Sequence, residues 1–292
     1  MKVSQSNGSY LEYFDEKQSV DIMAEAGFDA IDFGFFNEKF YNKETDGEEF
    51  KEKFLELKRY AESKGVLFNQ AHAPFPTSTM DEEETEAIFR NVVRSMRNAS
   101  YLGIDIIVVH PKHHLRYKEE GNPEKLFEEN IKFFKRLEPY CEKYNIRVAL
   151  ENLWQGYSFH AGWRVVNSVC SKPDEFVAYL DALNSPWFVA CLDIGHSMIV
   201  HQDPAEFIKK LGKKYLKALH VHDVEGNDDS HTIPYLGGMG DWDKIANALN
   251  AVGYEGDFTM EAVNFLKPLP VELYPIASKM IAETGRYVAN KI

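Results

Sequence analysis

Residues 191–196 read CLDIGH, and they complete a run of strand-forming residues that begins at Trp187. The strand would end on the carboxylate of Asp193, and His196 follows three residues later. Gly195 would let the chain turn sharply between the two. Such a strand presents an oxygen and a nitrogen ligand at its carboxyl end. A lone pair of this kind is common by chance, so its meaning depends on how the other strands end.

Five further segments with strand composition also end on histidine or glutamate. Their last residues are His72, His110, Glu151, His220 or His222, and Glu261. Each has an ordinary interpretation when taken alone: Glu151 could cap the loop that contains Asn152, and His72 could be a hydrogen-bonded core histidine. Six coincidences at the same relative position are much less expected than one. The pattern therefore predicts a shared metal site.

Short apolar segments and amphipathic helical segments alternate along the whole chain. Eight such strand–helix units are predicted, and the strands run from Lys2–Gln5 to Gly256–Glu261. Alternation of this kind indicates an α/β fold with a parallel sheet, and eight units in fewer than 300 residues favour a (β/α)₈ TIM barrel. No composition shift marks a boundary, so residues 1–292 are predicted to be a single TIM-barrel domain. The alternative is a doubly wound open sheet, although neither a Gly-x-Gly-x-x-Gly signature after the first strand nor a P-loop is present.

Composition limits the partners and the compartment. The formal net charge of -13 disfavours general attraction to nucleic acid or to anionic membranes. The three cysteines have no paired spacing, so no disulfide framework is expected. The first twenty residues lack the apolar core of a signal peptide, and no apolar run approaches membrane-spanning length. A cytoplasmic protein that binds neither nucleic acid nor membrane is expected.

The donor types indicate which ion would bind. Two glutamates, one aspartate and one histidine make a mainly oxygen set, which suits one divalent ion: Mn²⁺ first, with Mg²⁺, Co²⁺ or Zn²⁺ as alternatives. Cys191 lies deeper on the same strand face as Asp193 and is expected to pack in the core. After the seventh strand, Asp229 and His231 offer two further ligand-type side chains. Glycines 237, 238 and 240 then predict a flexible approach to the helix near Trp242, unless the whole segment is simply a solvated loop.

These motifs resemble those of the sugar phosphate isomerase/epimerase family in the xylose isomerase-like TIM-barrel superfamily. The matching stretches are ALEN at 149–152, CLDIGH at 191–196, LHVHD at 219–223, DSHTIPYLGGMGDW at 229–242 and TMEA at 259–262. The resemblance implies a metal held by Glu151, Asp193, His220 and Glu261. His222 is the fallback for the histidine ligand, since His220 and His222 would face the same way on a strand.

The resemblance also implies a reaction. Proton transfer next to a carbonyl would pass through an enediolate stabilised by the metal, with Glu151 and Glu261 as the catalytic acid and base. The substrate would be a small carbohydrate or a hydroxy-keto compound. The predicted substrate-binding residues are His72, His110, Trp154, His196, His222, Asp229 and His231. Whether the subunits pair into a homo-oligomer stays open.

Two alternatives belong to the same superfamily. Endonuclease IV, a zinc phosphodiesterase, uses a larger ligand set whose pattern is also matched here, but no Arg/Lys-rich segment that would follow a DNA backbone is present. Lyases or dehydratases that act on a keto acid or a glycoside are the other alternative. Ketose 3-epimerases usually carry an arginine six residues after the seventh-strand ligand, where this chain has Gly226 or Asp228. The absence of that arginine argues against epimerisation of free ketohexoses in particular.

Overall fold

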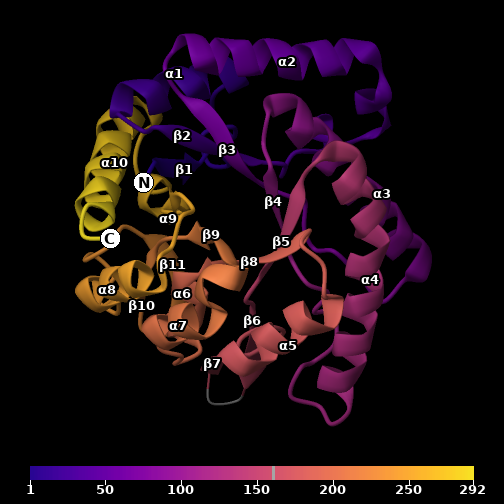
Figure 1. Ribbon diagram of the computed structural model, residues 1–292. Coiled ribbons are helices and arrows are strands. Elements are labelled where there is room, and N and C mark those ends of the chain that lie inside the picture. The colour runs from indigo at the N-terminus through magenta and orange to yellow at the C-terminus, as the bar shows by residue number, and fades with distance from the viewer. Residues whose placement is uncertain (160–161) are drawn as a thin grey trace.

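The structure is a computed structural model that describes residues 1–159 and 162–292. Eight parallel strands form one sheet in the order β12-β1-β2-β3-β4-β5-β8-β9 (Figure 1). The strands are β1 (Val3–Ser6), β2 (Ala30–Gly34), β3 (Leu67–His72), β4 (Ile106–Val109), β5 (Arg147–Glu151), β8 (Phe188–Asp193), β9 (Leu216–His220) and β12 (Phe258–Met260). The first and last strands of this order, β12 and β9, meet just beyond the end of β9. There Val221 bridges to Met260 and accepts a backbone hydrogen bond from Glu261 at 2.9 Å, which closes the barrel. The predicted (β/α)₈ barrel is confirmed.

Helices cover the outside of the barrel, as Figure 1 shows. The helices are α1 (Glu16–Ala26), α2 (Glu48–Ser63), α3 (Glu82–Leu102), α4 (Asn122–Tyr144), α5 (Pro173–Leu183), α6 (Ile194–Ile199), α7 (Pro204–Tyr215), α8 (Trp242–Val252), α9 (Val263–Leu266) and α10 (Tyr274–Ala289), with 3₁₀ turns η1 (Glu38–Phe40), η2 (Lys43–Asp46) and η3 (Val271–Leu273). Local sequence fixes their ends. In α1, the Asp15 side chain accepts from the Gln18 backbone, and Gly27 ends the helix at a φ of 92°.

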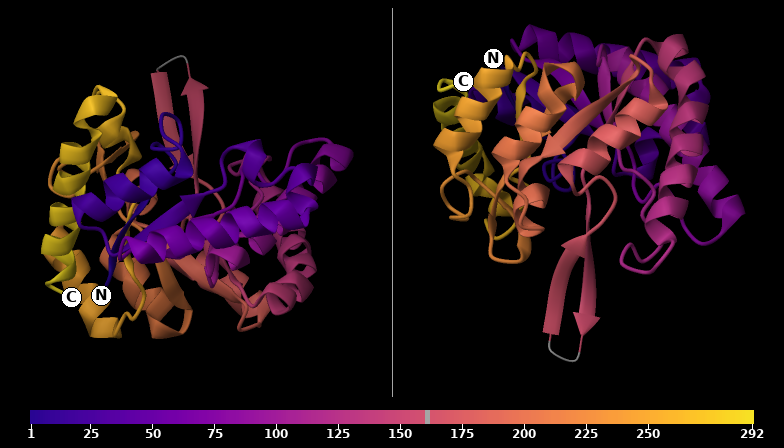
Figure 2. Two further views of the ribbon diagram at one scale, coloured as in Figure 1. Left: turned by 90° about the horizontal axis from the view of Figure 1, so that it is seen from above. Right: turned by 60° about the horizontal axis from the view of Figure 1, so that its bottom comes forward.

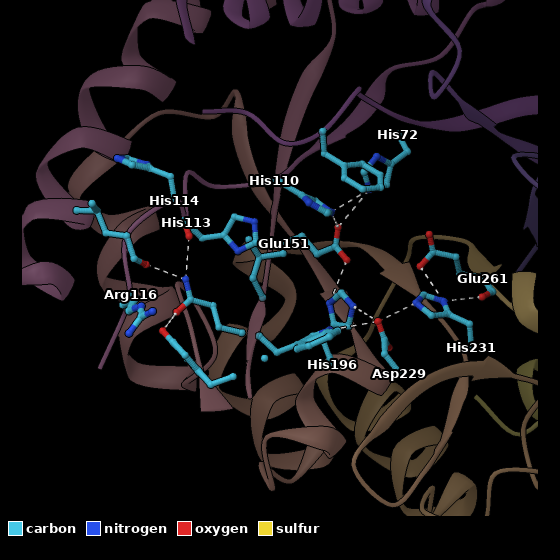
Figure 3. A pocket seen from close by; sticks show the side chains of 17 residues that line it. His72, His110, His113, His114, Arg116, Glu151, His196, Asp229, His231 and Glu261 are labelled. Carbon is cyan, nitrogen blue, oxygen red and sulfur yellow. Dashed lines mark hydrogen bonds and ion pairs between the residues drawn. The ribbon is translucent and has the colours of Figure 1, made fainter. Parts of the chain in front are cut away.

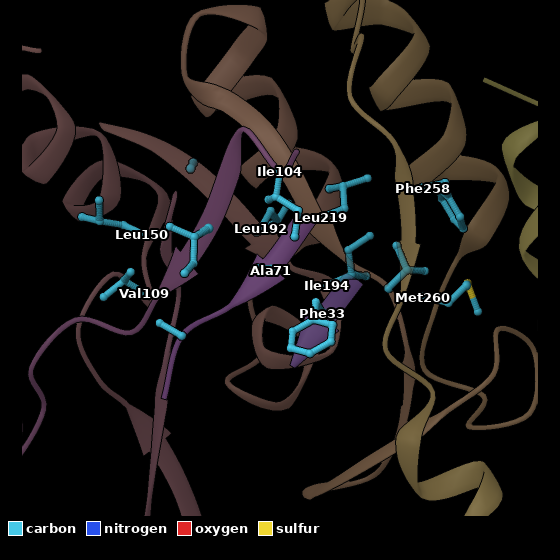
Figure 4. Packing of buried hydrophobic residues seen from close by; sticks show 14 of the residues in the cluster. Phe33, Ala71, Ile104, Val109, Leu150, Leu192, Ile194, Leu219, Phe258 and Met260 are labelled. Carbon is cyan, nitrogen blue, oxygen red and sulfur yellow. The ribbon is translucent and has the colours of Figure 1, made fainter. Parts of the chain in front are cut away.

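Two apolar layers follow from the alternation of side chains along each strand. Outward-facing residues such as Phe33, Val109 and Leu150 pack under the helices (Figure 4). A smaller cluster fills the barrel interior and consists of Ile106, Val108, Ala149, Val189, Cys191 and Ala218. Cys191 is fully buried in this cluster, in agreement with the packing role predicted for it.

Two hairpins interrupt the strand–helix alternation, and neither was predicted. β6 (Trp154–Phe159) pairs antiparallel with β7 (Gly162–Asn167), and Figure 2 shows this hairpin extending away from the barrel. β10 (Asp223–Glu225) pairs with β11 (Asp228–Thr232) after β9. Both follow strands that end in site residues, so they add walls to the mouth of the barrel. None of the helices in the described ranges has the length and apolar composition needed to cross a bilayer.

Candidate functional site

Six strand ends bring their polar residues to one mouth of the barrel. His72, Glu151, Asp193 and His220 are the last residues of β3, β5, β8 and β9, while His110 and Glu261 directly follow β4 and β12. Beside them lies a cavity of about 570 Å³ (Figure 3). Its wall includes predicted site residues between positions 72 and 261, namely His72, His110, Glu151, Trp154, His196, Asp229, His231 and Glu261. The barrel strands, the two hairpins and α6 therefore together gather residues that are far apart in sequence.

The predicted metal ligands form one compact group. Glu151, Asp193, His220 and Glu261 each offer a ligand atom, and these atoms all lie within 4.8 Å of one another. The Nδ1 atom of His220 lies 3.2 Å from Glu151 Oε1 and 3.4 Å from Glu261 Oε2. Three carboxylates buried around one imidazole repel one another unless a cation compensates them. The donor set therefore fits a divalent cation.

Asp32, in the middle of β2, lies behind this group and was not predicted as a site residue. Its Oδ2 atom is 3.8 Å from Nε2 of His220, the ring nitrogen that faces away from Glu151. Both Asp32 oxygens and this Nε2 are buried without a hydrogen-bond partner among the described residues. Burial raises the pKa of Asp32 to about 6. A carboxylate behind a ligating histidine orients the ring and strengthens it as a ligand.

A second group lies beside the first. His196, His222, Asp229 and His231 also bring ligand-type atoms within 4.8 Å of one another. Asp229 Oδ2 is the centre of this group: it accepts hydrogen bonds from His231 Nε2 and Trp154 Nε1, each at 3.2 Å, and lies 3.4 Å from His196 Nε2. Trp154 is thereby fixed in the wall of the cavity at the base of β6.

His222 occupies a different place from the other predicted substrate-binding residues. It is fully buried and is not part of the cavity wall. Its Nε2 atom lies 3.0 Å from Asp193 Oδ1, and its ring stacks on that of His231 with centroids 3.8 Å apart. His222 therefore does not face the cavity itself, but it contacts Asp193 and His231 and helps to hold their side chains in position.

A third group joins the first at Glu151. His72 Nε2 and His110 Nε2 lie 3.5 Å and 3.1 Å from Glu151 Oε2, and the two ring nitrogens are 3.1 Å apart. Glu151 is thus shared between this pair of histidines and the four-residue group. The shared carboxylate links the two parts of the site.

Charges within the site stabilise one another. Burial opposes the ionisation of Glu151, but the imidazoles of His220 and His110 outweigh it and hold its pKa well below its usual range. Burial likewise opposes the charged form of His196, but Asp193 and Asp229 raise its pKa well above the usual value. Burial opposes the imidazolium of His231, yet Asp229 raises its pKa to about 9. Glu151 is therefore ionised at neutral pH, as both metal binding and proton abstraction require.

The CLDIGH stretch folds differently from the predicted sharp turn. Asp193 is the N-cap of helix α6, and its Oδ1 atom accepts from the backbone N–H of His196 at 2.6 Å. Gly195 lies inside this helix, and a Cβ atom there would come within 1.9 Å of the His222 ring. Glycine is required because an imidazole lies against the backbone, which corrects the turn argument made from the sequence.

The glycine-rich segment before α8 is also held more firmly than predicted. The carboxylate of Asp223 accepts six hydrogen bonds, from the backbone N–H groups of residues 224, 235, 238, 239 and 240 and from Trp242 Nε1, at 2.9–3.2 Å. Asp223 is fully buried. The predicted flexible approach is therefore a loop folded around one buried carboxylate.

Known proteins share this architecture. The family described as xylose isomerase-like TIM barrel matches residues 20–281. A D-psicose 3-epimerase from Enterocloster bolteae is 22% identical over 267 residues, which cover 85% of this chain and 77% of the epimerase. The crystal structure of a D-tagatose 3-epimerase-like protein has a TM-score of 0.75 at 22% identity, and the match covers 99% of this chain and 98% of that one. The structure of the IOLI protein with a binding zinc atom has a TM-score of 0.73 at 17% identity, with 99% and 96% covered. Because the family match spans most of the sequence, the chain belongs to the xylose isomerase-like TIM-barrel family.

Proposed function

We propose that this protein is a divalent-metal-dependent sugar isomerase or epimerase that moves a proton on the carbon next to a carbonyl. The observation that carries the proposal is the four-residue group of Glu151, Asp193, His220 and Glu261, which opens on the cavity through its two glutamates. Support comes from relatives whose names include D-psicose 3-epimerase and D-tagatose 3-epimerase-like protein, and from the zinc atom in the IOLI protein.

The two glutamates have separate positions around His220. Glu151 ends β5 and Glu261 follows β12, and their carboxylates lie 3.2 Å and 3.4 Å from the same Nδ1 atom. A bound divalent ion would supply positive charge where the substrate oxygens become negative. One glutamate removes the proton, and the other returns it, from the opposite face of the carbon when the reaction is an epimerisation.

Neighbouring side chains would orient the substrate. The ring nitrogens of His196 already face protein oxygens: Nδ1 donates to the backbone oxygen of Asn152 at 2.9 Å, and Nε2 lies 3.4 Å from Asp229 Oδ2. His231 is held in the same way, 3.2 Å from Asp229 Oδ2 and 3.0 Å from the backbone oxygen of Glu261. Both rings are therefore fixed, and they shape the wall against which the substrate would lie. Trp154 presents its ring to the cavity while Asp229 holds its indole N–H. These residues bind and orient, and they leave the proton transfer to the glutamates.

The missing arginine has a structural explanation. Gly226, six residues after His220, lies in the tight turn between β10 and β11 at a φ of +59°, and it is exposed. An arginine there would meet backbone strain. Asp228, six residues after His222, begins β11 and is exposed. We therefore propose substrates other than free ketohexoses.

Deuterium exchange tests the proposal. Metal-loaded protein is incubated in deuterated water with a panel of ketoses, ketose phosphates and keto-glycosides, and incorporation of deuterium at carbon is followed by NMR. We expect exchange by the wild type, and a loss of at least 100-fold in Glu151→Gln and Glu261→Gln, because glutamine cannot accept the proton. Glu225→Gln, which changes an exposed glutamate on β10, is the matched control. If both site variants bind the metal fully and still exchange at the wild-type rate, the glutamates are not the bases.

A further inference from the structure

The cavity extends well beyond the proposed site of proton transfer. Its inner end contains Glu151 and Glu261, and its outer end is formed by His113, Leu115 and Arg116 after β4 together with Gln155 and Tyr157 of β6. Figure 3 shows Arg116 and Glu261 on opposite sides of the labelled residues. The volume of about 570 Å³ lies within the range of about 300–1,000 Å³ that holds drug-sized ligands. A single hexose has only twelve non-hydrogen atoms, so the outer end has room for more.

A partly buried polar network builds the outer end. Gln155 Nε2 donates to the backbone oxygens of His113 and Leu115, both at 2.8 Å. Its Oε1 atom accepts from the Tyr117 backbone at 2.9 Å and from the Tyr157 hydroxyl at 2.7 Å. One side chain thus fastens the segment after β4 to the hairpin. A surface fixed in advance in this way loses little freedom when a ligand binds.

The side chains of the outer end suit a neutral ring. Leu115 and Leu153 offer apolar faces, and the Tyr157 ring lies beside two exposed cations, with Arg116 and Lys118 at 5.8 Å and 5.2 Å from its centroid. Burial lowers the pKa of His113 to about 4, so this imidazole is uncharged at neutral pH and can accept a hydrogen bond from a hydroxyl group. Its Nδ1 atom is buried and has no hydrogen-bond partner among the described residues.

The outer end of the cavity offers little positive charge to bind a phosphate group. Within the part of the chain that the structure describes, Arg116 is the one lysine or arginine that lines the cavity. Its side chain is 71% exposed, and its guanidinium lies 3.8 Å from Glu119. Lys118 does not line the cavity, although its Nζ atom lies 5.2 Å from the centroid of the Tyr157 ring, and it is exposed as well. Exposed cations that water screens make a weak anion site.

We propose that the substrate is a neutral glycoside: the reacting sugar, which carries the carbonyl, occupies the inner end, and a second, uncharged ring linked to it occupies the outer end against Leu115 and Tyr157. This inference rests on the proposed function, since it extends the same cavity to a larger substrate. Sugar phosphates are the competing class.

Binding to the metal-loaded protein tests the inference separately from catalysis. Isothermal titration compares cellobiose and maltose, whose reducing ends open to a carbonyl, with glucose and glucose 6-phosphate. We expect at least one disaccharide to bind at least tenfold more tightly than its monosaccharides, and Leu115→Ala or Tyr157→Ala to reduce that ratio at least fivefold. Circular dichroism of both variants checks that the fold is retained.

Three outcomes would overturn the inference. They are equal affinity for disaccharides and monosaccharides, the absence of binding by every sugar, or tighter binding of glucose 6-phosphate that Arg116→Ala removes. Failure of the proposed function has a different signature. In that case the disaccharide preference and its loss in the variants persist, while no tested sugar exchanges its carbon-bound hydrogen with solvent.

Discussion

Replacing Asp32 by asparagine separates metal binding from folding. Asparagine keeps the shape of the side chain and removes the charge that lies 3.8 Å from His220 Nε2. Loss of a carboxylate behind a ligating histidine typically weakens metal affinity by about 10–100-fold, which corresponds to about 1.4–2.7 kcal/mol. We therefore expect the Kd for Mn²⁺ or Zn²⁺ to rise by that factor in Asp32→Asn.

The stability of the metal-free protein should respond differently. Both Asp32 oxygens are buried without hydrogen bonds among the described residues, so the fold gains little from their charge. The Tm of metal-free Asp32→Asn is expected to equal or exceed that of the wild type. Metal titration against a competing chelator gives Kd, and calorimetry gives Tm. Asp105→Asn, which changes an exposed aspartate, is the control. A Kd within twofold of the wild type, or a clear fall in the metal-free Tm, would refute the positioning role.

Three further predictions concern stability, metal and DNA. Burial raises the pKa of Glu175 from 4.5 to about 7, so the folded state holds this proton more tightly, and stability is lost as pH rises from about 4.5 to 7. Glu175→Gln should therefore stabilise the protein by up to about 3 kcal/mol at pH 8 and by little at pH 4.5, as measured by urea denaturation; equal effects at both pH values would contradict this. Removal of metal by a chelator should lower Tm and abolish hydrogen–deuterium exchange of the substrate, and added Mn²⁺ or Zn²⁺ should restore both. A Tm that does not change when metal is removed or added would argue against a resident ion. With a net charge of -13, the protein should leave a DNA duplex with an abasic site uncut at physiological salt, and incision at the rate of a repair enzyme would favour the phosphodiesterase instead.

The sequence alone was sufficient to locate the mouth of the barrel. Polar residues at the ends of apolar segments are visible as a pattern, and parallel strands necessarily bring such ends together. His220 and His222 could not be separated from the sequence, because an extended strand would point both to one face. In the structure, β9 ends at His220, and the chain then carries His222 beside His196 and His231.

Other residues were missed for physical reasons. Asp32 lies within a strand, and its role depends on the facing residue of a strand almost 190 positions away, which no local pattern encodes. Its signal was a carboxylate inside a buried segment, where a charge requires a partner. No role was predicted for Asp223, which entered only as the last residue of the LHVHD match, because its six donors come mainly from a loop more than ten residues later. The β6–β7 hairpin has the aromatic and β-branched residues of strands, but it interrupts the regular alternation of strands and helices.

Anomalous diffraction at the metal absorption edges tests the central claim most directly. Crystals of protein purified without added metal would show how many ions the site holds and which side chains bind them. The proposed isomerase predicts one ion, bound by Glu151, Asp193, His220 and Glu261. The second and third groups of histidines and carboxylates are the places where additional ions would bind if the protein were a phosphodiesterase. No peak among these four residues, or peaks of equal height that also lie between His196, Asp229 and His231 and beside His72 and His110, would contradict the account and favour phosphodiester cleavage.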